Sequence, residues 1–288
     1  MSNWCTTSIT LAAVGEKGKK CLFDLSKKLL DQLNSENNFI KNDFGPGWLG
    51  NIAILFNMTT IPEALEDNFH GYNCRGSIIC VNEDLEEVEE YGSLNLTQED
   101  AWDPNLNIWL GIINKYYLDE NGEPLIQLYY QAEESGMGLY YTNDDIGRFY
   151  PDNYCIDISI DHIEPNDFPF YTQKPNSPFI KVNQNIDPLI LSNPLFITNG
   201  SKLNGDLSPL PPAFYEMPNL SCYYYCREQE ALRIGQLMFP EVNNMKELDN
   251  KISEYIDKNN NAYIGINQYV YCSAEDVDPL PLDDNLPW

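Results

Sequence analysis

Apolar residues recur along the first part of the chain with two different periods, and each period predicts an element. Residues 4–14 predict a first strand that begins almost at the N-terminus. Leu22, Leu25 and Leu29 follow at helical spacing, so a helix is expected after Gly18. Further elements are expected before residue 82: a buried strand over 48–56, where the apolar run is almost continuous, a capped helix start at 60–63, and a strand over 74–81.

Residues 91–141 predict strand, helix, strand and strand, and the rest of the chain is organised around them. Residues 93–97 alternate polar and apolar side chains, as a half-buried strand does. Asp103-Pro104 is expected to open a helix, with Asp103 as N-cap and Pro104 at the first helical position. After Asn121-Gly122, the segments 125–131 and 137–141 predict a hairpin of aromatic-rich strands.

The second half of the chain changes character. A strand is expected over 154–160, but the prolines of 164–218 exclude long helices and central strands, which leaves an ordered excursion or an extended connection. A strand over 222–226, helices over 229–239 and 245–256 and a strand over 262–272 then predict a small α+β unit. The expected organisation is a first α+β domain over 1–163, a proline-rich connecting segment over 164–218, the small α+β unit over 219–273 and an acidic tail over 274–288.

Composition adds a strong charge signal to this picture. The 288 residues include 44 acids and 17 bases, which gives a formal charge of -27. Such a charge repels phosphate backbones and anionic lipids, so neither direct nucleic-acid binding nor membrane binding is expected. The sequence has no transmembrane-length apolar window and no signal-peptide pattern at its N-terminus, and its eight cysteines are scattered. We therefore expect a cytoplasmic protein whose thiols are mostly buried.

Three short motifs occur in the first 160 residues: Asn3-Trp4-Cys5 before the first strand, Ala101-Trp102-Asp103-Pro104 at a helix start, and a hairpin with Tyr129-Tyr130 and Gly136. With these motifs the chain resembles the YubB ferredoxin-like family of phage and plasmid proteins. The chain departs from the family at 91–95, which read Tyr-Gly-Ser-Leu-Asn where the family has Trp-Gly-Thr-Lys-Trp. This resemblance implies a ferredoxin-like α/β sandwich encoded by a mobile element and located in the host cytoplasm. It implies no catalytic residues.

Few residues support an enzymatic site. His70 and His162 are the two histidines, and neither stands in a hydrolase motif. Cys222 and Cys226 have the wrong gap for a zinc ribbon, although Cys74 or Cys272 would be able to join them in space. The sequence contains no Walker loop and no dinucleotide-binding glycine motif, and no cofactor is expected.

A divalent-metal site is the better enzymatic alternative. Its oxygen and nitrogen ligands would come from Asp157, Asp161, His162 and Glu164, with Asp167 following. Asp157 and Asp161, however, would lie roughly 13 Å apart along a straight strand at ~3.4 Å per residue. A metal-dependent hydrolase using this cluster is therefore kept as the alternative function.

Acidic residues are densest over 83–90, where they are expected to crowd one exposed helical face. A solvated face is the ordinary explanation of such a run. Carboxylates spread over one face also stand in for phosphates, which predicts a non-enzymatic phage or mobile-element protein that inhibits a host defence or nucleic-acid-processing protein. The expected partner has a basic nucleic-acid-binding surface, and a homo-oligomer is compatible with the sequence. The candidate partner-binding residues are Glu83, Asp84, Glu86, Glu87, Glu89, Glu90, Glu99, Asp100, Glu275 and Asp276.

Overall fold

A computed structural model of the chain describes residues 4–35, 38–43, 45–65, 68–69, 72–82, 84–160, 171–173, 180–182, 197–198, 201–202, 220–239, 241–257 and 262–277. Over these residues the protein is a mixed α+β structure, which confirms the expected fold class, whereas the ferredoxin-like topology stays a prediction. The chain divides into unit 1, Met1–Tyr150 with Val270–Trp288, and unit 2, Pro151–Tyr269. Unit 2 is thus inserted into the sequence of unit 1.

The sheet of unit 1 is built around β1 (Trp4–Ala13), which pairs with a neighbour on each side. It runs antiparallel to β5 (Ser93–Ala101) and to β6 (Ile126–Glu134). The strand order is β15-β7-β6-β1-β5-β4. β4 (Gly76–Val81) is antiparallel to β5, β7 (Leu139–Thr142) forms the expected hairpin with β6, and β15 (Val270–Tyr271) is parallel to β7. A separate short pair joins β2 (Asn68–Phe69) to β3 (Tyr72–Asn73).

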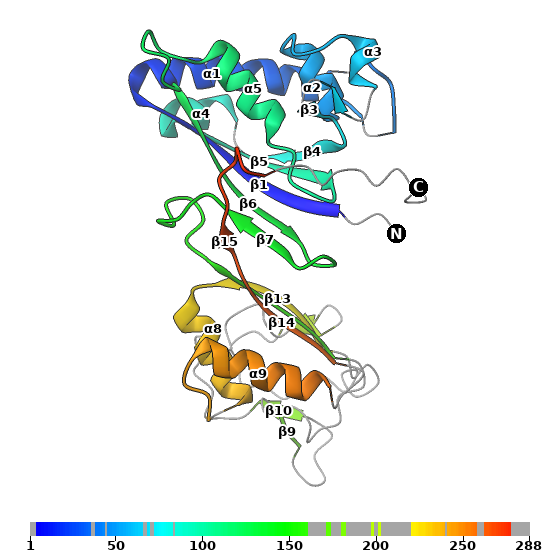
Figure 1. Ribbon diagram of the computed structural model, residues 1–288, viewed down its shortest axis with the longest axis vertical. Coiled ribbons are helices and arrows are strands. Elements are labelled where there is room, and N and C mark those ends of the chain that lie inside the picture. The colour runs from blue at the N-terminus through cyan, green and yellow to red at the C-terminus, as the bar shows by residue number, and fades with distance from the viewer. Residues whose placement is uncertain are drawn as a thin grey trace. The chain divides into compact units, whose positions relative to one another are not determined.

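Helices cover one face of this sheet (Figure 1). They are α1 (Gly15–Leu33), α2 (Leu49–Leu55), α3 (Ile61–Ala64), α4 (Leu85–Tyr91) and α5 (Asn107–Tyr116). Every second residue of β5 is buried, as strand alternation requires, and Leu94 and Leu96 belong to one hydrophobic core with residues of α1 and α5. The largest fully buried side chain of that core is Trp109 of α5.

Residues 49–55 form helix α2, so the buried strand expected over 48–56 is wrong. Leu49, Ile52 and Ala53 are buried at helical spacing. Asn51 is buried as well, and its side chain accepts a hydrogen bond from the Ile40 N–H and donates to the carbonyls of Ile40 and Gly45. A continuous apolar run suits a buried helix as well as a buried strand, and the periodicity alone did not separate the two.

The helix expected from Asp103-Pro104 begins only at Asn107, as α5. Asp103 is buried and does not cap it, and Trp102 has a positive φ of 76°. The intervening residues form an irregular segment, in which the Asn105 N–H donates to the Asp100 carboxylate. The N-cap signal at Asp103 was therefore misassigned.

Unit 2 contains a five-stranded sheet with the order β12-β11-β13-β8-β14. β8 (Tyr154–Ile160) lies between β13 (Leu220–Cys226) and β14 (Ala262–Gln268) and is antiparallel to both. The expected helices are α8 (Glu228–Met238) and α9 (Met245–Ile256). The described parts of the proline-rich segment are short strands: β9 (Tyr171–Gln173), β10 (Ile180–Val182), β11 (Ile197–Thr198) and β12 (Ser201–Lys202). The rest of that segment lies outside the described residues.

Strand pairing moves the expected boundary of the first domain. β8 was assigned to a domain ending at residue 163, but it pairs with strands of unit 2, which begins at Pro151. The single strand expected over 262–272 is divided between the two units, β14 in unit 2 and β15 in unit 1. Of the acidic tail, residues 274–277 are described, and Ala274 and Val277 are buried in the core of unit 1.

Candidate interaction face

The acidic run forms the short helix α4, and its own residues cap it. The Asp84 side chain accepts the N–H groups of Glu86 and Glu87, and the Glu87 carboxylate accepts the Asp84 N–H in return. Gly92 ends the helix in the left-handed conformation at φ 66°. This helix is therefore defined by local contacts, a capping box at its start and a glycine C-cap at its end.

The helix presents its carboxylates to solvent and its apolar residue to the protein. Val88 is fully buried in the core, whereas Glu86, Glu89 and Glu90 are exposed. We call these three glutamates and Tyr91 the α4 face. Asp84 and Glu87 are exposed too, but their carboxylates serve the capping box. Glu83, the first residue of the predicted set, lies outside the described residues.

Tyr91 is the residue of this face that the sequence interpretation missed. Its side chain is 66% exposed at the end of α4. Large exposed aromatic side chains offer rigid contact area and recur at the centres of protein interfaces. Helical spacing alone would place Tyr91 on the same side as Val88, three residues earlier, so no pattern in the sequence indicated its exposure.

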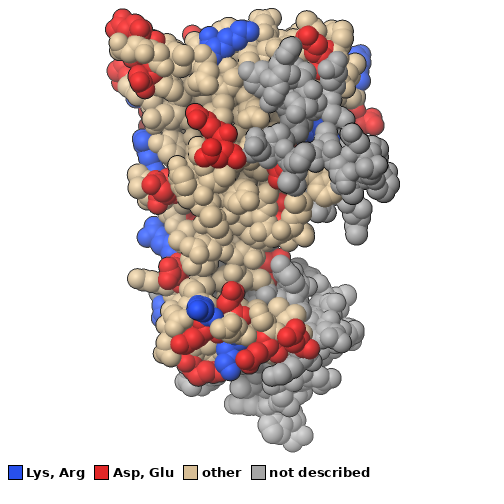
Figure 2. All heavy atoms as spheres, in the orientation of Figure 1, with Lys and Arg blue, Asp and Glu red and all other residues tan. Residues whose placement is uncertain are grey.

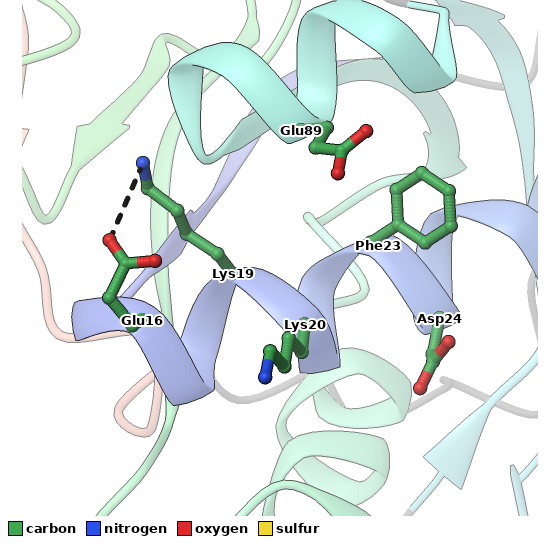
Figure 3. A pocket seen from close by; sticks show the side chains of 6 residues that line it. All are labelled: Glu16, Lys19, Lys20, Phe23, Asp24 and Glu89. Atoms are coloured by element: carbon green, nitrogen blue, oxygen red, sulfur yellow. Dashed lines mark ion pairs between the residues drawn. The ribbon is translucent and has the colours of Figure 1, made fainter.

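A groove of about 510 Å³ is lined by α1 and by one residue of α4. Its lining is Glu16, Lys19, Lys20, Phe23 and Asp24 of α1 with Glu89 of α4. Figure 3 shows Glu89 pointing from α4 towards Phe23 of α1, and Lys19 paired with Glu16 at 3.8 Å. Charges of both signs line the groove. Glu86 and Glu90 do not line it and carry negative charge only.

Asp100 does not belong to an exposed face, and its assignment as a partner-binding residue is wrong. Strand alternation on β5 places its side chain in the interior, at 0% exposed, while Glu99 is half-buried on the opposite side of the strand. The strand had been expected to end near Thr97, so the inward direction of Asp100 was not recognised. Asp100 was assigned to the exposed set because acidic residues are dense nearby, and the alternation of buried and exposed residues along the strand was not taken into account.

Asp100 is instead the centre of a buried polar cluster. Its carboxylate accepts the Gln98 Nε2 group at 2.9 and 2.8 Å, the Asn105 N–H at 3.1 Å and Asn105 Nδ2 at 3.2 Å. Thr7 Oγ1 of β1 donates to it at 3.4 Å. The Trp109 indole N–H of α5 donates to Gln98 Oε1 at 2.9 Å and joins the helix to the cluster.

The other acidic candidates lie elsewhere in unit 1. Glu275 and Asp276 are exposed in the turn that follows β15, where the Asp276 N–H donates to the Ser273 carbonyl. This turn belongs to a different element from α4, and its neighbours Ala274 and Val277 are anchored in the core. Both residues are therefore held on an ordered surface of unit 1.

The alternative metal cluster falls largely outside the described residues. Asp157 is described on β8, where it stands between Tyr223 of β13 and Gly265 of β14. Asp161, His162, Glu164 and Asp167 lie outside the described residues. Within the part of the chain that the structure describes, no three His, Cys, Asp or Glu side chains are close enough to hold a metal ion together.

The expected burial of the cysteines is confirmed in part. Cys5, Cys74, Cys155 and Cys226 are buried free thiols, whereas Cys80 is exposed. Burial raises the pKa of the Cys74 and Cys226 thiols to about 12, which keeps both protonated.

Among the described helices none is long and apolar enough to cross a membrane.

Comparison with known proteins gave no match, whether with family models, with curated proteins or with solved structures. The resemblance to the YubB family therefore stays a prediction.

Proposed function

We propose that this chain is a non-enzymatic acidic binding protein of a phage or mobile element, and that it inhibits a host defence or nucleic-acid-processing protein by occupying a basic nucleic-acid-binding surface. The observation that carries this proposal is the α4 face: three exposed glutamates and an exposed tyrosine on one short helix. Its carboxylates stand in for phosphates, and Tyr91 supplies apolar contact area.

The spacing of the glutamates is unfavourable for the stability of the helix, which supports a role in binding. Glu86 and Glu90 stand one helical turn apart, where two like charges destabilise a helix by about 0.2–0.5 kcal/mol. No basic residue lies within α4, and Arg75 is the one base between Glu63 and Asp103. A helix that served only as a solvated face would gain from alternating charges.

The charge of the whole chain supports the same partner class. The formal charge of -27 steers association with a basic surface and repels nucleic acid itself. Figure 2 shows acidic side chains in several separate groups over the drawn face, with fewer basic ones between them. An interface of this kind associates quickly at low salt and is weakened by screening.

The test compares two variants of the full chain with the same charge change. Glu86→Gln, Glu89→Gln and Glu90→Gln together neutralise the α4 face and leave Asp84 and Glu87 to cap the helix. Asp31→Asn, Glu120→Gln and Glu123→Gln remove as much charge from exposed positions outside α4. Each tagged protein is used to pull down partners from a lysate of defence-carrying bacteria at low and at high salt, and retained proteins are identified by mass spectrometry.

We expect the wild-type chain to retain a nuclease, helicase or restriction subunit at low salt and to lose it at high salt. The α4 triple variant should lose most of this retention, while the control triple variant keeps it. Purified partner should then release a bound DNA duplex when the wild-type chain is added, because both ligands compete for one basic surface. Equal retention by both variants would exclude the α4 face, and simultaneous binding of DNA and this chain would exclude charge mimicry.

A further inference from the structure

The groove lined by α1 and α4 contains more acidic than basic side chains. Its acids are Glu16, Asp24 and Glu89, and its bases are Lys19 and Lys20. Three negative charges against two positive ones leave one negative charge in excess. The positions of the four charged residues on α1 indicate that Glu89 of α4 carries this excess.

Lys19 is compensated at one end of the groove. Its ammonium group lies 3.8 Å from Glu16 Oε1. The stem of the Lys19 side chain lies against Gly92, the C-cap of α4, because a Cβ atom built on Gly92 would be 3.3 Å from Lys19 Cε. Packing and charge therefore hold this lysine in place.

Lys20 and Asp24 stand one helical turn apart on α1, where opposite charges attract each other across the helix surface. Figure 3 shows both side chains directed away from Glu89. Glu89 itself is exposed, and within the part of the chain that the structure describes its carboxylate has no hydrogen-bond donor and no ion pair. It is the acid of the groove that no base balances.

The aromatic ring of the groove lies next to this carboxylate. In Figure 3 the Glu89 side chain is directed towards the half-buried Phe23 ring. The face of an aromatic ring attracts cations through its quadrupole. A cation placed between the two groups would therefore gain from the ring and from the carboxylate at once.

Buried neighbours fix both walls of the groove. Leu22 and Leu25 of α1 lie on either side of Phe23 in the sequence and are fully buried. Val88, which precedes Glu89 on α4, is fully buried in the same hydrophobic core. Because the backbone of both helices is anchored in this way, binding in the groove does not require that either helix be ordered first.

We propose that this groove binds a guanidinium group, which stacks on the Phe23 ring and pairs with the Glu89 carboxylate, and that the group belongs to an arginine side chain of the basic partner. A guanidinium suits this site better than an ammonium group, because it is planar, more weakly hydrated, and able to stack while its N–H groups donate to a carboxylate. The inference rests on the proposed function for the source of the arginine, whereas the site itself should bind a small guanidinium compound without the partner.

The test titrates the purified full chain with Nα-acetyl-argininamide, whose guanidinium is its only charge. Nα-acetyl-citrullinamide is the control ligand, since it has a similar shape and a neutral urea group. The NMR signals of the Phe23 ring report binding, and their absence from Phe23→Leu identifies them. Glu89→Gln is the test variant, and Glu86→Gln is the matched control because it removes the same charge from the same helix outside the groove.

We expect argininamide to shift the Phe23 ring signals saturably, with a dissociation constant on the order of 1 mM. Glu89→Gln should weaken this binding about two- to fivefold, as the loss of one exposed ion pair does, while Glu86→Gln changes it little. The side-chain methylene signals of the ligand should move upfield on binding to the wild type, because they lie over the ring, and should not move with Phe23→Leu.

Equal shifts with argininamide and citrullinamide would overturn the guanidinium site, and so would equal affinities in Glu89→Gln and Glu86→Gln. Phe23→Leu in the pull-down separates this inference from the proposed function. Full retention of the partner by Phe23→Leu, with loss in the α4 triple variant, would overturn the arginine contact and leave the proposed function standing. Argininamide binding without any retained partner would confirm the guanidinium site and overturn its assignment to a partner's arginine.

Discussion

At the scale of single residues, Gly76 at the start of β4 has no room for a side chain. A side chain there would collide with Asp100 and with the β5 backbone at Glu99, so the close approach of the two strands requires glycine. Gly76 is not among the glycines with positive φ, and its role is therefore steric. The Asp100 cluster and the β4–β5 pairing both require that residue 76 carries no side-chain methyl group.

We therefore expect Gly76→Ala to lower the free energy of unfolding by about 1–3 kcal/mol, since the methyl group forces the strands or the carboxylate to shift. Urea denaturation with circular dichroism measures the change. The matched control is Ser77→Ala on the same strand, whose buried hydroxyl has no hydrogen-bond partner among the described residues. The control should be neutral or mildly stabilising, and a Gly76→Ala protein as stable as this control would contradict the steric account.

At the scale of elements, α4 is held by its caps and by one buried residue. It is short, and Val88 is its fully buried side chain. Short helices are marginal in water without such support. The geometry of the α4 face consequently depends on Asp84, which supplies the N-cap.

We expect Asp84→Ala to lower the free energy of unfolding by about 1 kcal/mol, because two N–H groups of the first turn lose their acceptor. Asp84→Asn keeps a side-chain oxygen and should change stability far less, although it removes the same charge. Urea denaturation of both variants separates the cap from the charge. Equal losses in the two variants would show that charge, and not capping, stabilises α4.

The sequence predicted elements well where the period was clear and poorly where polar residues are buried. α9 was expected over 245–256 and has these bounds, because its apolar residues are regularly spaced and Asn244 caps it. α2 was mistaken for a strand although Leu49, Ile52, Ala53 and Phe56 follow helical spacing. Asn51 was the informative residue: inside a buried strand its amide would lack partners, whereas in α2 it binds the preceding loop.

The candidate site was predictable only in its exposed part. The caps and glutamates of α4 are local features, and residues a few positions apart define them. The buried cluster is not local, because Thr7 reaches Asp100 across 93 positions of sequence. Gln98 and Asp100 look like surface residues by type, and only their position on the inner side of β5 makes them interior.

At the scale of the whole molecule, the chain enters unit 2 after Tyr150 and returns to unit 1 at Val270. The sequence analysis missed this insertion because its evidence is strand pairing between distant segments. Val270 and Tyr271 complete the edge of a sheet whose first strand begins at Trp4. The domains were expected to follow one another because composition changes along the chain, but composition carries no information about pairing partners.

Net charge is the property that acts on both units at once. A formal charge of -27 opposes compaction, because every carboxylate repels the others more strongly in the folded than in the expanded chain. The Debye length falls from about 30 Å at 0.01 M salt to about 10 Å at 0.1 M, so moderate salt screens this repulsion. Stability should therefore increase with ionic strength, in contrast to the binding that we propose, which should weaken.

We expect the urea midpoint of unfolding to rise between about 10 mM and 300 mM NaCl and to rise equally in KCl, because the effect is one of screening. Sucrose at equal osmolality is the control for solvent exclusion. Neutralising Glu86, Glu89 and Glu90 removes three of the 44 acidic residues and should make the salt dependence slightly shallower. A midpoint that is unchanged or lower in both salts would show that the carboxylates are already balanced by local contacts. The excess charge would then not destabilise the folded state.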